Sequence, residues 1–167
     1  LNPLLKIKEL IIYQHNGLFL HLISNLINKV ELFGLHFASL DIRQESTVHG
    51  KVLEAIAEKQ PSLLPGYNSL SDEEKLALLS GITETADTGL IENPVFADTL
   101  KVMTSVHTIQ YQNGQEGCNR YIISQCNSAL NAMEVYGLFL LSGWKKEELN
   151  VDIVPLFETI DDLTNAA

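Results

Sequence analysis

Three short apolar runs, separated by helical stretches, limit this chain more than any other feature of its sequence. A helix-like spacing of apolar residues lies between one expected strand and the next. Strands joined by helices pair in parallel, because a tight turn joins only antiparallel neighbours. A closed barrel of this kind needs eight strands, so we expect a mostly α chain whose few parallel strands form part of a (β/α) barrel. The predicted strands are Leu35–Ile42, Arg120–Ser124 and Val151–Phe157.

Helix boundaries follow from apolar spacing and from capping residues. Ser71-Asp72-Glu73-Glu74 fits a capping box, which starts a helix at Asp72. We expect Gly34 to end one helix, and Ser46 to cap the next. The predicted helices are Gly17–Phe33, Thr47–Gln60 with Pro61 as its stop, Asp72–Ser80, Pro94–Gln110 and Ser128–Trp144, with loops at 61–70, 81–93 and 111–119, while Asp161 and Asp162 suit the first turn of a further helix.

The charge balance excludes several classes of partner. The formal net charge is -10, from 11 basic and 21 acidic side chains, so nucleic acid is not an expected ligand. The basic residues form no dense run that would attract an anionic membrane. The most apolar long segment, Gly17–Phe33, contains His21, Asn25 and Lys29, so we interpret it as a core-facing helix and not as a membrane span.

Cysteine usage indicates a reducing compartment. Cys118 and Cys126 are the only cysteines, too few for a disulfide framework and wrongly spaced for zinc. We therefore expect two free thiols in a cytoplasmic protein, since no basic segment followed by an apolar stretch marks the chain for export. The chain opens on Leu1 and stops at Ala167, just where a last helix should form, so we expect an excised internal segment.

Arg43 and Glu158 are the strongest candidates for chemistry, because each lies near the carboxyl end of a predicted strand. The guanidinium of Arg43 offers a planar fork of donors that suits a phosphate group. The carboxylate of Glu158 suits Mg²⁺ or Mn²⁺, which take oxygen ligands. Structural explanations remain open: Arg43 could pair with Asp41 or Glu45, and Glu158 could favour the N-terminus of the next helix.

Four more residues are candidates for lining the same pocket. Gln44, Glu45 and His49 follow or flank the first strand, and Ser124 ends the second. His49 could equally lie on the first turn of its helix, and Ser124 could be a cap or a turn residue. The 5 histidines show no metal-ligand spacing on one face. No nucleophile elbow, Walker loop or dinucleotide-binding glycine run is present, so hydrolase, P-loop and Rossmann functions gain no support.

Taken together, three motifs resemble phosphoenolpyruvate carboxylase. They are LDIRQES at Leu40–Ser46 with His49, YIIS at Tyr121–Ser124, and VPLFETIDDL at Val154–Leu163. The first and third are specific, and all three occur in the family's order at compatible separations. The resemblance covers the chain from about Phe33 and, more loosely, the helix before it. It implies that residues 1–167 are a single segment, truncated at both ends, of the barrel domain in a larger, TIM-barrel-like helical enzyme.

The resemblance also implies an activity. The family is a carbon–carbon lyase that fixes carbon dioxide: it joins phosphoenolpyruvate to bicarbonate, giving oxaloacetate, a tricarboxylic acid cycle intermediate, and phosphate. Mg²⁺ or Mn²⁺ is the cofactor, and carboxyphosphate and an enolate are the implied intermediates. Arg43 matches the motif arginine that binds the substrate's phosphate, and Glu158 matches the glutamate that ligates the metal. A homo-oligomer, usually a tetramer, is implied for the full-length cytoplasmic enzyme.

Other motifs of the family are absent. These are the upstream Thr-Ala-His-Pro-Thr motif, the downstream Gly-Tyr-Ser-Asp-Ser-x-Lys-Asp motif with a second metal carboxylate, and the His-Gly-Arg-Gly-Gly loop. One arginine and one carboxylate do not make a preorganised site. We therefore expect no carboxylase activity and at best weak metal affinity from these 167 residues alone.

Two alternatives stay open at this point. The chain could be a non-catalytic helical binding or scaffold module, although such a module needs no arginine and glutamate at one rim. It could also belong to a different barrel enzyme that handles enolates with Mg²⁺. A segment cut from a closed barrel exposes strand edges and apolar helix faces, so we expect the fragment to self-associate or to rearrange locally.

Overall fold

The computed structural model describes residues 1–34 and 38–164. They form two compact units, Leu1–Ser39 and Leu40–Ala167, here named the hairpin unit and the sheet unit. The sequence predicts that residues 1–167 are one segment of a larger domain. Within this segment, the structure divides the chain into two units that each make most contacts internally.

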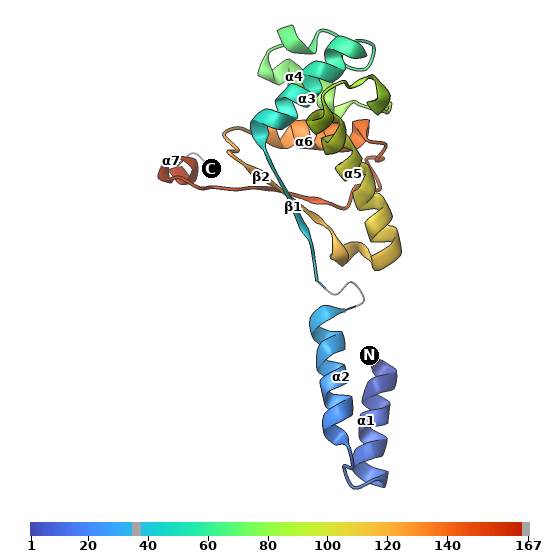
Figure 1. The fold of residues 1–167 in the computed structure, drawn as a ribbon. Coiled ribbons are helices and arrows are strands. Elements are labelled where there is room, and N and C mark those ends of the chain that lie inside the picture. The colour runs from blue at the N-terminus through green and yellow to red at the C-terminus, as the bar shows by residue number, and fades with distance from the viewer. Residues whose placement is uncertain (35–37, 165–167) are drawn as a thin grey trace. The chain divides into compact units, whose positions relative to one another are not determined.

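The hairpin unit consists of two helices that run side by side, α1 (Asn2–Gln14) and α2 (Leu20–Phe33) (Figure 1). The predicted helix starts at Leu20 and not at Gly17, because Gly17 and Phe19 have φ angles of 73° and 61° and so lie in the left-handed region. Gly34 ends α2 with a positive φ of 56°, as predicted.

A three-stranded parallel sheet organises the sheet unit. Its strands are β1 (Asp41–Glu45), β2 (Arg120–Ser124) and β3 (Asp152–Pro155), in the order β1-β2-β3. Both pairings are parallel, which confirms the prediction made from the helical connections. A small parallel sheet within a mostly helical chain agrees with part of an α/β fold, while the closed barrel stays a prediction.

The first strand does not lie where the sequence predicted it. Within the prediction Leu35–Ile42, residues 35–37 lie outside the described residues, and residues 38–40 are irregular. The strand therefore contains the polar cluster of Arg43, Gln44 and Glu45 instead of ending before it. Charges are tolerated there because successive side chains face opposite sides of a sheet, and Asp41 and Arg43 are on the exposed side.

Most helices of the sheet unit match their predictions closely. The capping box at α4 is present, since the Ser71 hydroxyl accepts from the Glu74 N–H and the Glu74 carboxylate accepts from the Ser71 N–H. The α5 helix runs further than predicted, through Asn113, and α6 is shorter than predicted at both ends. The predicted loops contain short 3₁₀ turns at Tyr67–Ser69, Thr88–Leu90 and Gln115–Gly117. The helices are α3 (Ser46–Lys59), α4 (Asp72–Ser80), α5 (Pro94–Asn113), α6 (Ala129–Leu141) and α7 (Ile160–Thr164).

The predicted helix cap at Ser46 is wrong. Ser46 is the first residue of α3, Glu45 occupies the cap position, and no side chain caps this helix. The Ser46 hydroxyl instead donates to the backbone carbonyl of Gln125 over 2.6 Å, just beyond the end of β2. A tertiary partner on the neighbouring strand has replaced the local hydrogen bond that the sequence pattern favours.

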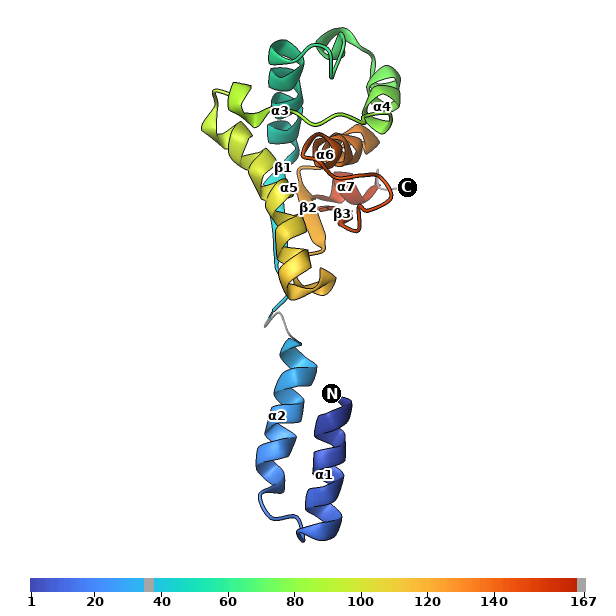
Figure 2. The ribbon, with the colours of Figure 1, turned by 90° about the vertical axis from the view of Figure 1, so that its right-hand side faces the viewer.

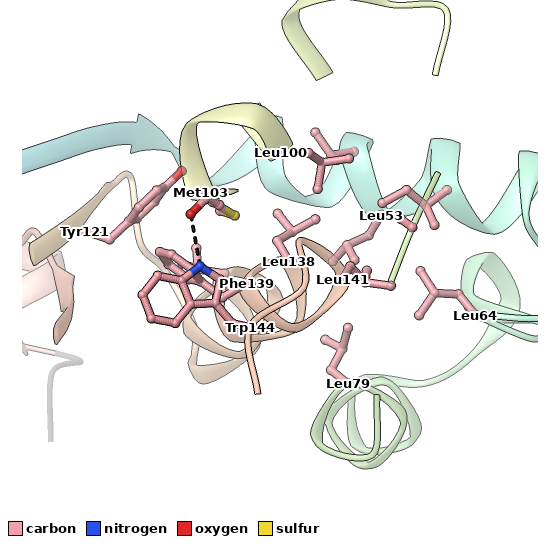
Figure 3. Close-up of a cluster of buried hydrophobic side chains, with 14 of the residues drawn as sticks. Leu53, Leu64, Leu79, Leu100, Met103, Tyr121, Leu138, Phe139, Leu141 and Trp144 are labelled. Carbon is pink, nitrogen blue, oxygen red and sulfur yellow. Dashed lines mark hydrogen bonds between the residues drawn. The ribbon is translucent and has the colours of Figure 1, made fainter. Parts of the chain in front are cut away.

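The core of the sheet unit lies between one face of the sheet and helices α3, α5 and α6 (Figure 2). Tyr121 and Ile123 of β2 are buried on this face. Figure 3 shows the cluster of buried side chains, in which the Trp144 indole N–H donates to the Met103 carbonyl over 3.0 Å. Fully buried members include Val52, Leu53, Ile56, Leu64, Leu79, Leu100, Met103, Leu138, Phe139 and Leu141.

Two smaller expectations concern the thiols and the membrane. Cys118 and Cys126 are both free and buried, and burial raises the pKa of each thiol. Within residues 1–34 and 38–164, no helix is long and apolar enough to cross a bilayer.

Candidate active site at the strand ends

A single ion pair joins the two residues that the sequence singled out. The Arg43 guanidinium donates to the Glu158 carboxylate, with 2.6 Å between Nη2 and Oε1. The two residues are 115 positions apart in the chain: Arg43 lies in β1, and Glu158 follows β3, on the other side of β2 in the sheet. Both side chains remain open to solvent, with 55% and 44% of their surface exposed. The fold therefore brings a cation and an anion together at one accessible place.

The strand register places Arg43. It lies opposite Ile122 of β2, which in turn lies opposite Val154 of β3, so these three residues share the sheet face that the core helices leave open. The sequence predicted Arg43 just beyond the end of the first strand, whereas the structure places it within β1. A position within a paired strand restricts the backbone more than a loop position would.

Local capping bonds place Glu158. The Asp162 carboxylate accepts from the Glu158 N–H at 2.9 Å and from the Thr159 N–H at 2.8 Å. The Thr159 hydroxyl accepts in return from the Asp162 N–H at 3.1 Å, which completes a reciprocal cap at the start of α7. These hydrogen bonds hold the pKa of Asp162 below its usual value. The ETIDD sequence thus fixes the backbone that carries the Glu158 side chain.

The structural alternatives proposed for Arg43 are not found. Asp41 pairs with Arg120, with 3.5 Å between the nearest oxygen and nitrogen. Glu45 accepts a hydrogen bond from the Thr47 hydroxyl at 2.7 Å. Among the described residues, the ion-pair partner of Arg43 is therefore the distant Glu158 and not one of its two neighbours in the sequence.

Gln44 and Ser124 lie close together, but their contact uses the backbone carbonyl of Gln44 and not its side chain. The Ser124 hydroxyl donates to the Gln44 carbonyl over 3.4 Å, across the end of the β1–β2 pairing. The Gln44 side-chain oxygen accepts from the N–H of its neighbour Glu45. Gln44 also lines a groove of about 230 Å³ between β1 and α5, together with Tyr121 and Thr99. That groove is smaller than the usual ligand pocket of roughly 300–1,000 Å³.

His49 is buried and does not lie at an open rim. It lies on the first turn of α3, which was one of the two positions considered for it from the sequence, and none of its surface is exposed. Its Nε2 lies 2.9 Å from the Tyr121 hydroxyl, and its Nδ1 has no hydrogen-bond partner among the described residues. Burial lowers the pKa of His49 from 6.5 to about 4, so the ring is neutral at physiological pH.

Sequence reasoning missed three polar features. Gln125 adopts a left-handed backbone (φ 52°) at the carboxyl end of β2, where a non-glycine residue is uncommon. Tyr121 was predicted only as a residue of the second strand, and the role of its hydroxyl as a hydrogen-bond partner of His49 was not predicted. Glu134 is buried on α6 and accepts from the Tyr67 hydroxyl and the Asn131 amide, each at 3.2 Å. A lone acid within the apolar run ALNAMEVYGLFLL was the available signal for Glu134.

Comparison with known proteins decides the family. The family model described as phosphoenolpyruvate carboxylase matches residues 1–167. The chain belongs to the phosphoenolpyruvate carboxylase family. It is 33% identical to phosphoenolpyruvate carboxylase from Synechocystis sp. over 96% of this chain, and 34% identical to that from Trichormus variabilis over 93%. In both cases it spans only 16% of the relative's length, so it corresponds to a fragment of such a protein.

Membership of this family raises the question of a divalent metal. Within the described residues, no group of three or more histidine, cysteine, aspartate or glutamate side chains is placed to hold one. The Glu158 carboxylate has suitable chemistry, because Mg²⁺ and Mn²⁺ prefer oxygen ligands. It is a single ligand, however, and Asp162 is already engaged by two backbone N–H groups. The donor type of Glu158 fits a hard cation, but one carboxylate is not a complete metal site.

Proposed function

We propose that this chain is an internal fragment of a phosphoenolpyruvate carboxylase, in which Arg43 binds the substrate's phosphate and Glu158 is a ligand of Mg²⁺ or Mn²⁺. The parent enzyme joins phosphoenolpyruvate to bicarbonate and releases oxaloacetate and phosphate, as a carbon–carbon lyase. It has a closed (β/α) barrel, forms a homo-oligomer, in general a tetramer, and acts in the cytoplasm. The observation that carries the proposal is the 2.6 Å contact between the two motif residues across the sheet.

The chemistry of the pair supports these roles. A guanidinium binds phosphate oxygens through two parallel hydrogen bonds, and its charge stays positive throughout the reaction. Arg43 would hold the phosphate in one orientation and offset the negative charge that accumulates while the phosphoryl group is transferred to bicarbonate and the enolate leaves. The bound metal, once present, would act as a Lewis acid toward substrate oxygens. Glu158 would fix that charge a short distance from the guanidinium.

The ion pair itself can open at small cost. Exposed ion pairs contribute only about 0–1 kcal/mol, because water solvates both partners. Both side chains here are about half exposed. A phosphate group can therefore replace Glu158 as the partner of Arg43, and a cation can replace Arg43 as the partner of Glu158.

The test uses the complete polypeptide, with oxaloacetate formation as the readout. Activity should require phosphoenolpyruvate, bicarbonate and a divalent cation together. Arg43→Ala and Glu158→Ala should each lower kcat/KM by roughly 100-fold or more, as removal of a positioned charge does in other enzymes. Arg120→Ala is the matched control, since Arg120 also pairs across β1 and β2, with Asp41. It should retain near-parental activity.

Two results would refute the proposal. An inactive complete polypeptide would favour the alternative of a non-catalytic scaffold module. Equal losses in Arg43→Ala and Arg120→Ala would indicate general damage to the sheet and not a specific site.

The isolated 167-residue chain should form no oxaloacetate and bind Mn²⁺ at best weakly, because Glu158 is the one carboxylate assigned to the metal and no cluster of three or more potential ligands is found within the described residues. A coupled assay with the purified chain checks this, and detectable product would overturn it.

A further inference from the structure

A buried hydrogen bond lies directly behind the candidate site. The side chains of His49 on α3 and Tyr121 on β2 are 0% and 1% exposed, and 2.9 Å separates His49 Nε2 from the Tyr121 oxygen. The rings are tilted by 55° with centroids 5.5 Å apart, and Tyr121 also packs edge-to-face on Phe139. This hydrogen bond lies among apolar side chains of the core.

The His49–Tyr121 pair lowers the stability of the core relative to apolar side chains in the same space. Whichever nitrogen carries the ring proton, one polar atom, Nδ1, is buried without a partner within the described residues. An unsatisfied buried polar atom costs about 1–3 kcal/mol, whereas an apolar side chain of similar shape would cost nothing of that kind. Stability alone therefore does not explain a histidine here. A hydrogen bond has a defined length and direction, so it fixes the relative position of the two elements that it joins more closely than apolar packing does.

That geometry acts on the strand that carries Arg43. Tyr121 is the register partner of Ile42, the residue next to Arg43, and His49 lies on the first turn of the helix that follows β1. The hydrogen bond thus ties the start of α3, which directly follows β1 in the chain, to β2. Because Arg43 and Tyr121 are on opposite faces of the sheet, His49 can influence Arg43 only through the backbone.

Two further bonds hold the same junction. The Ser46 hydroxyl donates to the Gln125 carbonyl over 2.6 Å, and the Ser124 hydroxyl donates to the Gln44 carbonyl over 3.4 Å. Together with the His49 contact, they connect the β1–α3 junction to β2 at three places. Gln125 takes a left-handed conformation, with a φ of 52°. The sequence motif around Arg43 therefore contains further residues whose hydrogen-bond partners lie on β2 or directly after it.

We propose that His49 is a positioning residue, which through its hydrogen bond to Tyr121 holds β1 in the register and orientation that aim Arg43 at a phosphate group. This inference rests on the proposed function, since it assigns a role toward the same ligand. His49 itself does not touch that ligand. Its contribution is to the affinity for the phosphorylated substrate and not to the affinity for the metal.

The experiment compares three single variants of the complete polypeptide and the double variant that combines Tyr121→Phe with His49→Asn. Tyr121→Phe removes the hydroxyl and keeps the ring. His49→Asn ends its amide near the place of Nδ1 and loses the bond, whereas His49→Gln carries an amide near the place of Nε2 and can keep it. Calorimetry measures the Kd for phosphoenolpyruvate with Mg²⁺ and without bicarbonate, and separately the Kd for Mn²⁺ alone. Thermal unfolding of each variant is followed in parallel.

The inference predicts a specific pattern. Tyr121→Phe and His49→Asn should each raise the Kd for phosphoenolpyruvate about tenfold, because displacement of a binding group by a fraction of an ångström has effects of that order. The double variant should lose no more than either single one, since both remove one bond. His49→Gln should stay within about twofold of the parent, and the Kd for Mn²⁺ should not change in any variant.

Three outcomes would overturn the inference. A lower melting temperature with an unchanged Kd for phosphoenolpyruvate would make His49 structural only. An equal loss of Mn²⁺ affinity would indicate general damage to the site. If the parent polypeptide binds no phosphoenolpyruvate, the proposed function and the inference fail together, whereas normal binding by the parent with unaffected variants removes the inference alone.

Discussion

The hairpin unit and the sheet unit bury their apolar residues to very different extents. Helix α1 has no buried residue, and α2 buries only Ile23 and Ile27. Large apolar side chains of the hairpin stay exposed, among them Leu22 at 59% and Leu32 at 76%. In the sheet unit, by contrast, helices α3, α5 and α6 close one continuous core over the sheet. An apolar stripe predicts a helix equally well in both units, but it does not say whether the chain itself covers that stripe.

The difference assigns separate roles to the two units. The sheet unit contains its own core, so it can hold Arg43 and Glu158 in a defined arrangement. The hairpin exposes a large apolar surface, of the kind that marks a contact site. This surface is the one on which the expected self-association of the 167-residue chain would depend, and that expectation stays a prediction.

Matched leucine substitutions give the largest expected contrast between the units. Leu138→Ala removes a fully buried side chain from the sheet unit and should lower the free energy of unfolding by about 2–5 kcal/mol. Leu22→Ala, in the exposed part of the hairpin, should change it by less than about 0.5 kcal/mol. The single tryptophan, Trp144, lies in the sheet-unit core, so its fluorescence in a urea titration reports on that unit, while far-ultraviolet circular dichroism follows the helices of both units. Similar losses in both variants would contradict the contrast.

Acid should destabilise the sheet unit through His49. Burial lowers the folded-state pKa of His49 from 6.5 to about 4, so its contribution to stability is complete above pH 6.5 and is lost as the pH falls toward 4. The loss amounts to about 3 kcal/mol over that range. His49→Gln, which cannot take up the proton, should remove most of this slope in urea titrations between pH 7 and pH 4.5. An unchanged slope would show that other groups govern acid unfolding.

Glu134 should have the opposite dependence on pH, with a smaller effect. Burial raises its pKa, while hydrogen bonds from Asn131 and Tyr67 partly offset that shift. The protonated acid is therefore favoured in the folded state, and the stability that it contributes at low pH is lost as the pH rises through the raised pKa. Glu134→Gln should be more stable than the parent at pH 7, with a difference that shrinks on acidification. A less stable variant at pH 7 would mean that the hydrogen bonds outweigh the cost of burial.

Local patterns predicted much of the fold. The bounds of β2 and α4 follow from a β-rich run and a capping box, both of which act over a few residues. The start of β1 could not be predicted in this way, because its charged residues depend on a sheet face that stays open. Residues 1–16 received no prediction, although α1 forms there against α2.

The candidate site divides in the same manner. The motifs identified Arg43 and Glu158, and the fold brings them together. The roles of Ser46 and His49 could not be predicted, since their partners are more than 70 positions away, Tyr121 on β2 and Gln125 just beyond its end. Short-range rules propose a helix cap and a rim residue there, whereas long-range hydrogen bonds determine the actual contacts.

The smallest expected effect tests the central claim, that Arg43 and Glu158 are brought together for ligands and not to brace the sheet. A double-mutant cycle of Arg43→Ala and Glu158→Ala in the 167-residue chain, followed by Trp144 fluorescence in urea, measures the coupling energy of the pair. The half-exposed pair should contribute no more than about 1 kcal/mol. A coupling of about 3 kcal/mol or more, as for a buried pair, would show that the contact is structural and would contradict the assignment.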